Sequence, residues 1–216
     1  MISRPRMLNE PPGSGLLSRI ATVIVYVLAS FLLALLILNL YFSRNYMFTR
    51  VDGRSMQNTL QNSDWLYTDT RAAAERGQVV IIDVTDYPDK YKPDKDNADQ
   101  ERSIIKRLIA VEGDCVKCEY GTVYVKYAGG EYRALEEDYA YGTTGDFKEV
   151  EVGEGEIFFL GDNRSISHDS RAVGCLKYSD IIGVVPQWAI DIKWYSTGWE
   201  NFRAGVVNFF GSIFGY

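Results

Sequence analysis

An uncharged hydrophobic run near the N-terminus constrains this chain more than any other feature. Residues 20–42 contain no charged side chain, and Arg19 and Arg44 stand on either side of the run. At about 1.5 Å per residue, a helix of this length crosses a hydrocarbon core of about 30 Å. The apolar region of a cleaved signal peptide is shorter and is followed by small residues, which residues 39–42 do not supply. We therefore expect an uncleaved transmembrane anchor over residues 20–42 rather than a buried core helix.

The charges around this run indicate its orientation only modestly. Three arginines and one glutamate precede it, and two arginines follow it closely, so the positive-inside rule favours a cytoplasmic arm over residues 1–19. Residues 43–195 would then form an extracytoplasmic domain. The chain as a whole is acidic, with a formal net charge of −6, which argues against nucleic acid as a partner.

Strand-like segments dominate the sequence after the anchor. They are rich in β-branched and aromatic residues, and Tyr120-Gly121 reads as the turn of a hairpin. We predict a mostly β fold of antiparallel sheets, in addition to one N-terminal transmembrane helix. The predicted strands cover residues 78–84, 103–111, 115–118, 122–127, 156–160 and 181–185.

The remaining segments carry weaker signals. Helical periodicity outside the anchor is weak, apart from a possible turn at residues 71–75. Residues 86–102 are charged and contain two prolines, so we expect a solvated loop. Residues 196–216 form an apolar C-terminal tail, and its most apolar part, residues 202–216, is too short to span a membrane. The sequence leaves open whether this tail lies on the membrane, joins the core or is disordered.

Three cysteines need an explanation in such a domain. The simplest is that Cys115, Cys118 and Cys175 are half-buried residues with no shared role. A disulfide between the first two would require a bend, since their spacing along one strand separates the Cα atoms by about 10 Å. Zinc is disfavoured because the chain has no second ligand pair and only one histidine. We expect no metal and no cofactor.

Ser55 follows the anchor closely and is a candidate nucleophile, provided that a base can take its proton. Lys106 is one candidate base. It lies in an apolar run, and strand alternation places Leu108 and Ala110 on its face of the strand. Burial there would lower the pKa of the amine and allow it to accept a proton from serine. The alternative is a lysine whose stem packs on the sheet while its amine reaches water, and the local sequence alone favours this simpler reading.

The single histidine, His168, is the other candidate base. A triad of Ser55, His168 and Asp169 can be imagined. Adjacent residues point in divergent directions, however, so Asp169 is poorly placed to support its immediate neighbour. We expect His168 to be an exposed loop residue.

A longer motif alters the balance between these readings. Residues 161–174 follow the pattern G-D-N-R-x-x-S-x-D-S-R-x-x-G, and in this the chain resembles the type I signal peptidases, membrane-bound Ser-Lys proteases. Their nucleophile segment is matched by Ser55-Met56 with Thr59-Leu60, and their base segment by Lys106-Arg107 with Gly113-Asp114. The order of anchor, serine, lysine and long motif also agrees, and the resemblance extends from about residue 20 to about residue 185.

The resemblance implies catalytic roles for particular residues. Ser55 would be the nucleophile, Lys106 the general base, and Ser167 the serine that orients the lysine. Gly53 and Met56 would lie beside the oxyanion and the substrate. Many members carry a serine at the position of Gly53, so here the oxyanion would depend on the backbone N–H of Ser55.

The resemblance also implies two ion pairs that shape the site. Asp169 would pair with Arg171, and Asp162 with Arg107. Two departures concern the backbone: Asn58 replaces a frequent proline, and residues 110–114 replace the usual Gly-x-Pro-Gly-Asp. The large second domain of some members is missing, so the chain is similar to the smaller, Gram-positive-like form.

The implied function is removal of signal peptides from secreted preproteins after small residues of the A-x-A type. The substrate would bind extended, as an added strand. The lipid bilayer would be a second partner, and the protein would be a single-pass monomer of the cell membrane. One rival is a self-cleaving Ser-Lys repressor protease, but those proteins carry a DNA-binding domain. The other is a catalytically silent relative acting as a membrane-bound assembly or chaperone module, which should lack the serine or the lysine.

Overall fold

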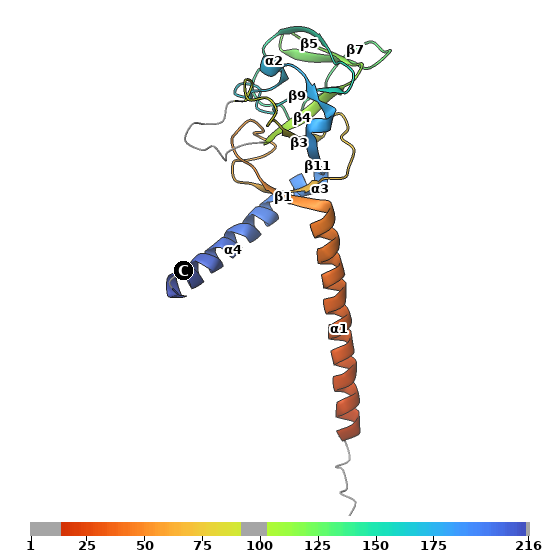
Figure 1. Ribbon diagram of the computed structural model, residues 1–216, viewed down its shortest axis with the longest axis vertical. Helices are drawn as coiled ribbons and strands as arrows, with labels where there is room; N and C mark the ends of the chain where they lie inside the picture. Colours follow the sequence, from red (N-terminus) through yellow and green to blue (C-terminus); the bar gives the residue numbers. More distant parts are fainter. Residues whose placement is uncertain (1–13, 92–102, 215–216) are drawn as a thin grey trace, which may run out of the picture. The chain divides into compact units, whose positions relative to one another are not determined.

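A computed structural model describes residues 14–91 and 103–214 of the chain (Figure 1). The chain divides into two compact units, Met1–Arg44 and Asn45–Tyr216. Parts of three predicted segments fall outside the described residues. These parts are residues 1–13 of the N-terminal arm, 92–102 of the charged loop and 215–216 of the tail.

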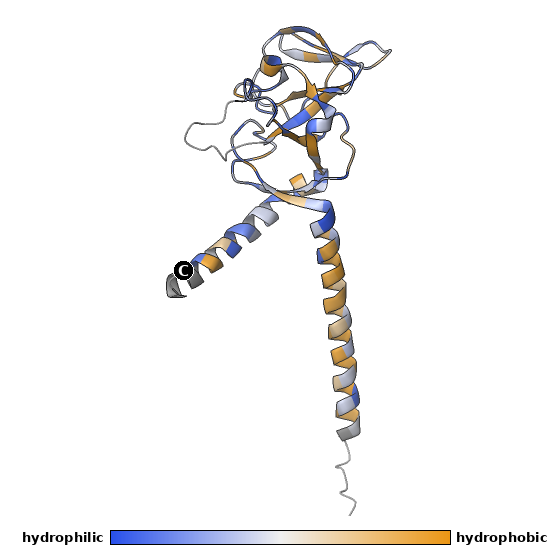
Figure 2. Ribbon diagram, in the orientation of Figure 1, coloured by the Kyte–Doolittle hydropathy of each residue, from blue (hydrophilic) through white to orange (hydrophobic). Residues whose placement is uncertain are grey.

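The first unit contains one long helix, α1 (Ser14–Asn45). Among the described residues, Gly15–Asn45 is the helix whose length and composition suit a membrane crossing, and the colours of Figure 2 show that most of its residues are hydrophobic. The hydroxyls of Thr22, Ser30 and Ser43 each donate to the carbonyl four residues earlier, at 2.8 Å. Because lipid offers no hydrogen-bond partners, this internal satisfaction suits a helix in a bilayer.

The second unit consists of two antiparallel sheets, which confirms the predicted mostly β class. The first sheet runs in the order β1 (Tyr46–Arg50), β2 (Trp65–Asp69), β11 (Ile181–Val185), β3 (Val79–Asp83), β4 (Ser103–Val111), β9 (Glu156–Leu160) and β10 (Leu176–Lys177). The second runs in the order β7 (Tyr132–Ala134), β6 (Thr122–Lys126), β5 (Cys115–Glu119) and β8 (Phe147–Glu151).

The predicted hairpin joins β5 to β6. Tyr120 and Gly121 both have positive φ, of 53° and 78°, as the two central residues of a type I′ turn require. Cys115 and Cys118 pair in register with Lys126 and Val123 along this hairpin, and all three cysteines of the chain are free thiols.

Strand β4 contributes to the cores on both sides of its own bend. Leu108 packs in one buried cluster with Val80 and Phe159, whereas Ala110 packs with Ile109 in another, beneath the second sheet. The ladder between β4 and β9 shifts register between Leu108 and Ala110. The prediction that Ala110 shares a face with Lys106 was therefore wrong, because a bulge interrupts the alternation of side chains.

Helical structure after the anchor is more extensive than the sequence reading suggested. Residues 71–75 do not form a helical turn. The C-terminal tail, by contrast, belongs to a helix of 22 residues, α4 (Lys193–Phe214). The shorter helices are α2 (Ser170–Val173), η1 (Tyr178–Asp180) and α3 (Gln187–Asp191).

Gly183 should be intolerant of a side chain, because β11 passes very close to β2 at this point. A Cβ at Gly183 would lie 2.7 Å from the carbonyl oxygen of Asp69 and 2.8 Å from Cγ2 of Thr68. We expect Gly183→Ala to lower the free energy of unfolding by about 1–3 kcal/mol through this overpacking. The control is Gly145→Ala, where the added Cβ meets no atom within 4 Å. Equal stability of the two variants, measured by chemical unfolding, would contradict the close packing.

Candidate active site

Ser55 lies in the turn that connects β1 to β2. Hydrogen bonds from Val51 N to Asp64 O and from Ser63 N to Val51 O, both 2.8 Å, close the base of this connection. Met56 is buried in a cluster beneath the turn, so an apolar side chain next to the nucleophile anchors it. Gly53 adopts a φ of +89°, and its N–H donates to Asn62 Oδ1.

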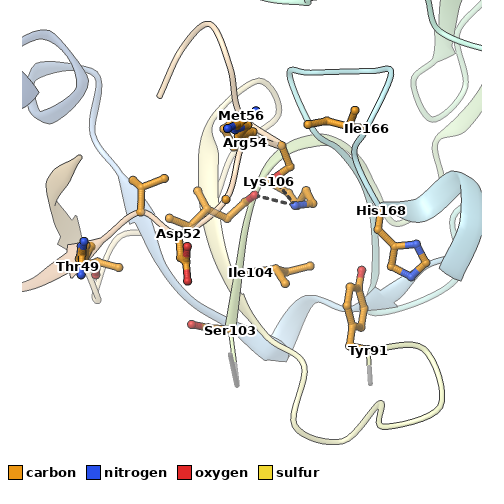
Figure 3. Close-up of a pocket in the computed structure, with 15 residues that line it drawn as sticks. Thr49, Asp52, Arg54, Met56, Tyr91, Ser103, Ile104, Lys106, Ile166 and His168 are labelled. Carbon is orange, nitrogen blue, oxygen red and sulfur yellow. Dashed lines mark hydrogen bonds between the residues drawn. The ribbon is translucent and has the colours of Figure 1, made fainter. Parts of the chain in front are cut away.

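Lys106 reaches Ser55 from strand β4, which is separated from β2 in the sheet by β11 and β3. Its Nζ lies 2.8 Å from Ser55 Oγ, as the dashed line in Figure 3 marks, and also donates to the carbonyl of Ile105 at 3.1 Å. The residue is only 5% exposed. The structure thus brings the two predicted residues together, and it does not place the lysine amine out in water as the simpler reading required.

The motif of residues 161–174 packs directly against the nucleophile. Asn163 N donates to the carbonyl oxygen of Ser55 at 2.9 Å. A Cβ at Gly161 would lie 2.6 Å from that same oxygen and 2.1 Å from Ser167 Oγ. Glycine is therefore required at 161 by the close approach of two backbones.

Ser167 lies beside this contact. Its hydroxyl is buried and has no hydrogen-bond partner among the described residues. The structure places Ser167 at the site, as predicted, but without the hydrogen bond to Lys106 that the resemblance implies. That role stays a prediction.

Arg107 and Asp162 form a buried, bidentate ion pair. The Nε–Oδ1 and Nη2–Oδ2 distances are 2.8 and 2.5 Å, and the exposures of the two residues are 7% and 0%. Thr59 Oγ1 donates to the same carboxylate, and the ring of Tyr139 covers the guanidinium at 3.8 Å. This pair has the charge-assisted, forked geometry that gives a strong and directional contact.

Asp169 and Arg171 form the second predicted pair, with Nε–Oδ1 at 2.8 Å and Nη2–Oδ2 at 2.9 Å. Asp169 also accepts from Gly161 N at 3.0 Å and caps α2. Burial alone would raise the pKa of Asp169, but the Arg171 guanidinium and the Gly161 N–H outweigh it and hold the pKa below its usual value.

Sequence reasoning missed a third ion pair in the same motif. The buried guanidinium of Arg164 pairs with Glu137, and it also donates to Thr144 Oγ1 at 2.8 Å and Gly161 O at 3.0 Å. Glu137 and Thr144 come from the segment between β7 and β8. No sequence pattern identified that segment as part of the site. The only available indication was Arg164 itself, because a buried arginine requires an acidic partner.

His168 takes no part in the contact between serine and lysine. Its Nε2 lies 3.0 Å from the carbonyl of Lys90, and its ring is edge-on to Tyr91 at 5.3 Å. It is exposed, as predicted, and Figure 3 shows it beside Tyr91 rather than beside Lys106. Since Asp169 is held by Arg171, the imagined histidine triad is not formed.

Ser55 and Lys106 border a cleft of about 550 Å³. One wall is the segment that ends at Ser55 and Met56, and the opposite wall is the start of β4. The part of the chain that the structure describes contains no group of three or more His, Cys, Asp or Glu residues suited to a metal. The full lining is Thr49, Arg50, Val51, Asp52, Gly53, Arg54, Ser55, Met56, Tyr91, Ser103, Ile104, Ile105, Lys106, Ile166 and His168.

Known proteins resemble this chain in sequence. The family described as "Signal peptidase, peptidase S26" matches residues 20–188. The chain belongs to this family. Signal peptidase I U of Bacillus subtilis is 30% identical over 76% of this chain and 85% of its own length. Signal peptidase I of Bacillus licheniformis is 34% identical over 56% of this chain and 63% of its own length. A solved signal peptidase I of Enterococcus faecalis V583 aligns with a TM-score of 0.41 at 25% identity, over 53% of this chain and 98% of that one.

Because Asp169 is ionised in the folded protein, the free energy of unfolding should depend on pH in the acidic range. Its folded-state pKa lies below the unfolded value of about 3.9, so its stabilising contribution is complete above that value and disappears as the pH falls through the folded pKa. We expect Asp169→Asn to unfold more easily at neutral pH and to lose less stability than the wild type below about pH 4. Urea unfolding at several pH values measures this. The control, Glu131→Gln on an exposed turn, should follow the wild type. Parallel pH curves for wild type and Asp169→Asn would refute the assignment.

Proposed function

We propose that this chain is a membrane-anchored serine endopeptidase that removes signal peptides from exported preproteins. The observation that carries the proposal is the 2.8 Å contact between Ser55 Oγ and a buried Lys106 Nζ within an open cleft. Similarity to enzymes named signal peptidase I supports the same activity. The alternative of a catalytically silent relative is not favoured, because both reacting groups are present and in contact.

The proposed mechanism uses Lys106 as the proton carrier throughout. The uncharged amine takes the proton of Ser55 as Oγ attacks the scissile carbonyl, and the backbone N–H of Ser55 stabilises the oxyanion. The resulting ammonium gives its proton to the leaving amine, and the C–N bond breaks to leave an acyl-enzyme. Lys106 then removes a proton from water as the water oxygen attacks the ester carbonyl. The bond between this carbon and Ser55 Oγ breaks, the acyl group leaves as a carboxylic acid, and Lys106 returns the proton to Oγ.

The cleft suggests how the substrate is held. Pairing of β4 with β3 extends over Ser103–Arg107, whereas pairing with β9 begins only at Arg107. The first residues of β4 therefore border the cleft with one edge next to Lys106. We propose that the signal peptide binds there in extended form as an added strand, with small residues of the A-x-A type before the cut. Larger side chains would be rejected by overpacking.

The anchor determines where in the cell the reaction takes place. We propose that α1 crosses the membrane with residues 1–19 in the cytoplasm, that residues 43–195 form the extracytoplasmic catalytic domain, and that the enzyme works as a monomer in contact with lipid. Tethering holds the site where signal peptides emerge and raises its effective concentration there.

Replacing either member of the dyad should abolish cleavage. We expect Ser55→Ala and Lys106→Met to be inactive although folded, and the double variant to be hardly worse than either, since the two groups act as one unit. His168→Ala is the matched comparison and should keep nearly the normal rate. The measurement is cleavage of a preprotein by the detergent-solubilised enzyme, with the cut site mapped by mass spectrometry. Substantial turnover by Lys106→Met, or a loss above about a hundredfold for His168→Ala, would sink the dyad.

Ser167→Ala should slow cleavage without destabilising the domain. The hydroxyl is buried and makes no hydrogen bond within the described residues, so its removal leaves no polar partner unsatisfied. A lower cleavage rate at unchanged stability would then indicate that Ser167 orients Lys106 during catalysis. The control is Ser165→Ala, an exposed residue of the same motif. Loss of thermal stability with normal activity per folded molecule would make Ser167 merely structural.

The dependence of rate on pH should follow the titration of Lys106. Because only the uncharged amine accepts the serine proton, kcat/KM should rise with pH along a limb whose midpoint is the pKa of this residue. The pKa can be measured separately in Ser55→Ala, by following the pH dependence of Lys106 modification with an amine reagent. Two midpoints that differ by more than about one unit would assign the limb to another group.

A further inference from the structure

Helix α4 is attached to the β domain by its polar side. Lys193 Nζ donates to the carbonyl of Thr59. One helical turn later, Ser196 Oγ donates to Trp65 O at 2.5 Å, and Trp65 N donates to Thr197 Oγ1 at 2.9 Å. These contacts fix the base of α4 on strand β2 and on the turn that carries the nucleophile.

Beyond its first turn α4 is largely exposed, and residues 201–208 are exposed on every side. Tyr195, Trp199, Phe202 and Val206 follow one another at spacings of four, three and four residues, which puts them on one face of the helix. Their exposures are 61%, 55%, 63% and 37%. A helix on the surface of a soluble domain packs its apolar stripe against the core. The described part of the protein leaves the stripe of α4 uncovered, which calls for another surface to cover it.

We propose that the apolar stripe of α4 (Tyr195, Trp199, Phe202 and Val206) lies in the interfacial layer of the same lipid bilayer that holds α1, as a second membrane contact. Tryptophan and tyrosine are the residues that favour this layer, because they have an apolar ring and a polar tip. An amphipathic helix with aromatic residues on one face and few charges lies in the plane of such an interface. Helix α4 lies beyond residues 20–188, so this contact is an addition to the matched family region.

The continuity of the chain supports lipid as the occupant. The anchor ends at Asn45 and β1 begins at Tyr46, so the first strand starts where the chain leaves the membrane helix. Strand β1 pairs along its length with β2, and the base of α4 docks on β2. The helix is thus only one strand away from the strand that the anchor tethers to the bilayer.

An aromatic band joins these elements. Phe48 stacks on Trp65 at 4.9 Å across β1 and β2, and Trp188 on α3 lies 5.5 Å from Tyr46 and 5.8 Å from Tyr67. The band is only partly buried. It forms a path of interfacial residue types from the first residue after the anchor to the base of α4, so one membrane surface can contact them all.

Fluorescence quenching tests the contact directly. The full-length protein is reconstituted in phosphatidylcholine and phosphatidylglycerol vesicles whose acyl chains are brominated at either a shallow or a deep carbon. The signal of Trp194 and Trp199 is the difference between wild type and the double variant Trp194→Phe, Trp199→Phe. We expect this signal to be quenched, and more strongly by shallow than by deep bromines. Absence of quenching, or stronger quenching by deep bromines, would overturn an interfacial position.

Two variants that introduce the same charge distinguish the role of the stripe from that of the rest of the helix. Phe202→Glu places a carboxylate on the stripe, whereas Asn201→Glu places the same charge on the neighbouring, exposed polar side. We expect the first to remove most of the quenching and the second to leave it unchanged. Equal effects of the two substitutions on quenching would overturn the proposal. It would also be overturned if the stripe showed no quenching and the protein instead formed dimers through it in a concentration-dependent way.

Cleavage assays keep this proposal distinct from the proposed function. Both charge variants should hydrolyse a short soluble peptide in detergent at the wild-type rate, while Phe202→Glu should cleave a vesicle-bound preprotein more slowly. A wild-type protein that is quenched as expected but cleaves neither substrate would refute the peptidase function and leave the membrane contact standing. Equal rates of all three proteins on the vesicle-bound preprotein would show that the contact does not assist cleavage.

Discussion

The ion pair between Arg107 and Asp162 fixes the relative position of the two reacting groups. Arg107 directly follows Lys106 on β4, and Asp162 lies between Gly161 and Asn163, the two residues that pack against the carbonyl of Ser55. Because both charges are buried, loss of one partner would leave the other uncompensated, at a cost of about 3–5 kcal/mol. The fold therefore cannot easily separate the strand of the lysine from the turn of the serine.

The sequence predicted those parts of the fold whose signals are local and buried. Strand β4 has the predicted bounds of residues 103–111, and the Tyr120-Gly121 hairpin is present, because β-branched runs and turn residues act within a few positions. Five strands were missed. Strands β7 and β10 have only three and two residues, which carry too little pattern to recognise. Strands β1, β2 and β8 have five residues each, but no predicted strand covers them. Helix α4 has the right spacing of apolar residues, but its stripe is exposed and a search for core-forming helices passes over it.

The residues of the candidate site likewise fall into those that the sequence predicted and those that it did not. The sequence allowed us to predict Ser55, Lys106 and the two ion pairs, because the long motif and the base segment identify these residues by resemblance. Glu137 and Tyr139, which hold Arg164 and cover Arg107, were not, since their roles depend on contacts between segments distant in the sequence. The bulge before Ala110 was hidden for the same reason: it appears only where β4 pairs with β9.

The strands on either side of the nucleophile also carry the attachments of the domain. Strand β1 follows the anchor directly, β2 holds the base of α4, and the turn between them contains Ser55. Ser55 is ten residues beyond the end of α1 in sequence, and a fully extended chain of that length reaches at most about 35 Å. The serine can therefore never be far from the end of α1, whatever the rest of the domain does. The scaffold beyond β2 serves to bring the lysine to this nucleophile.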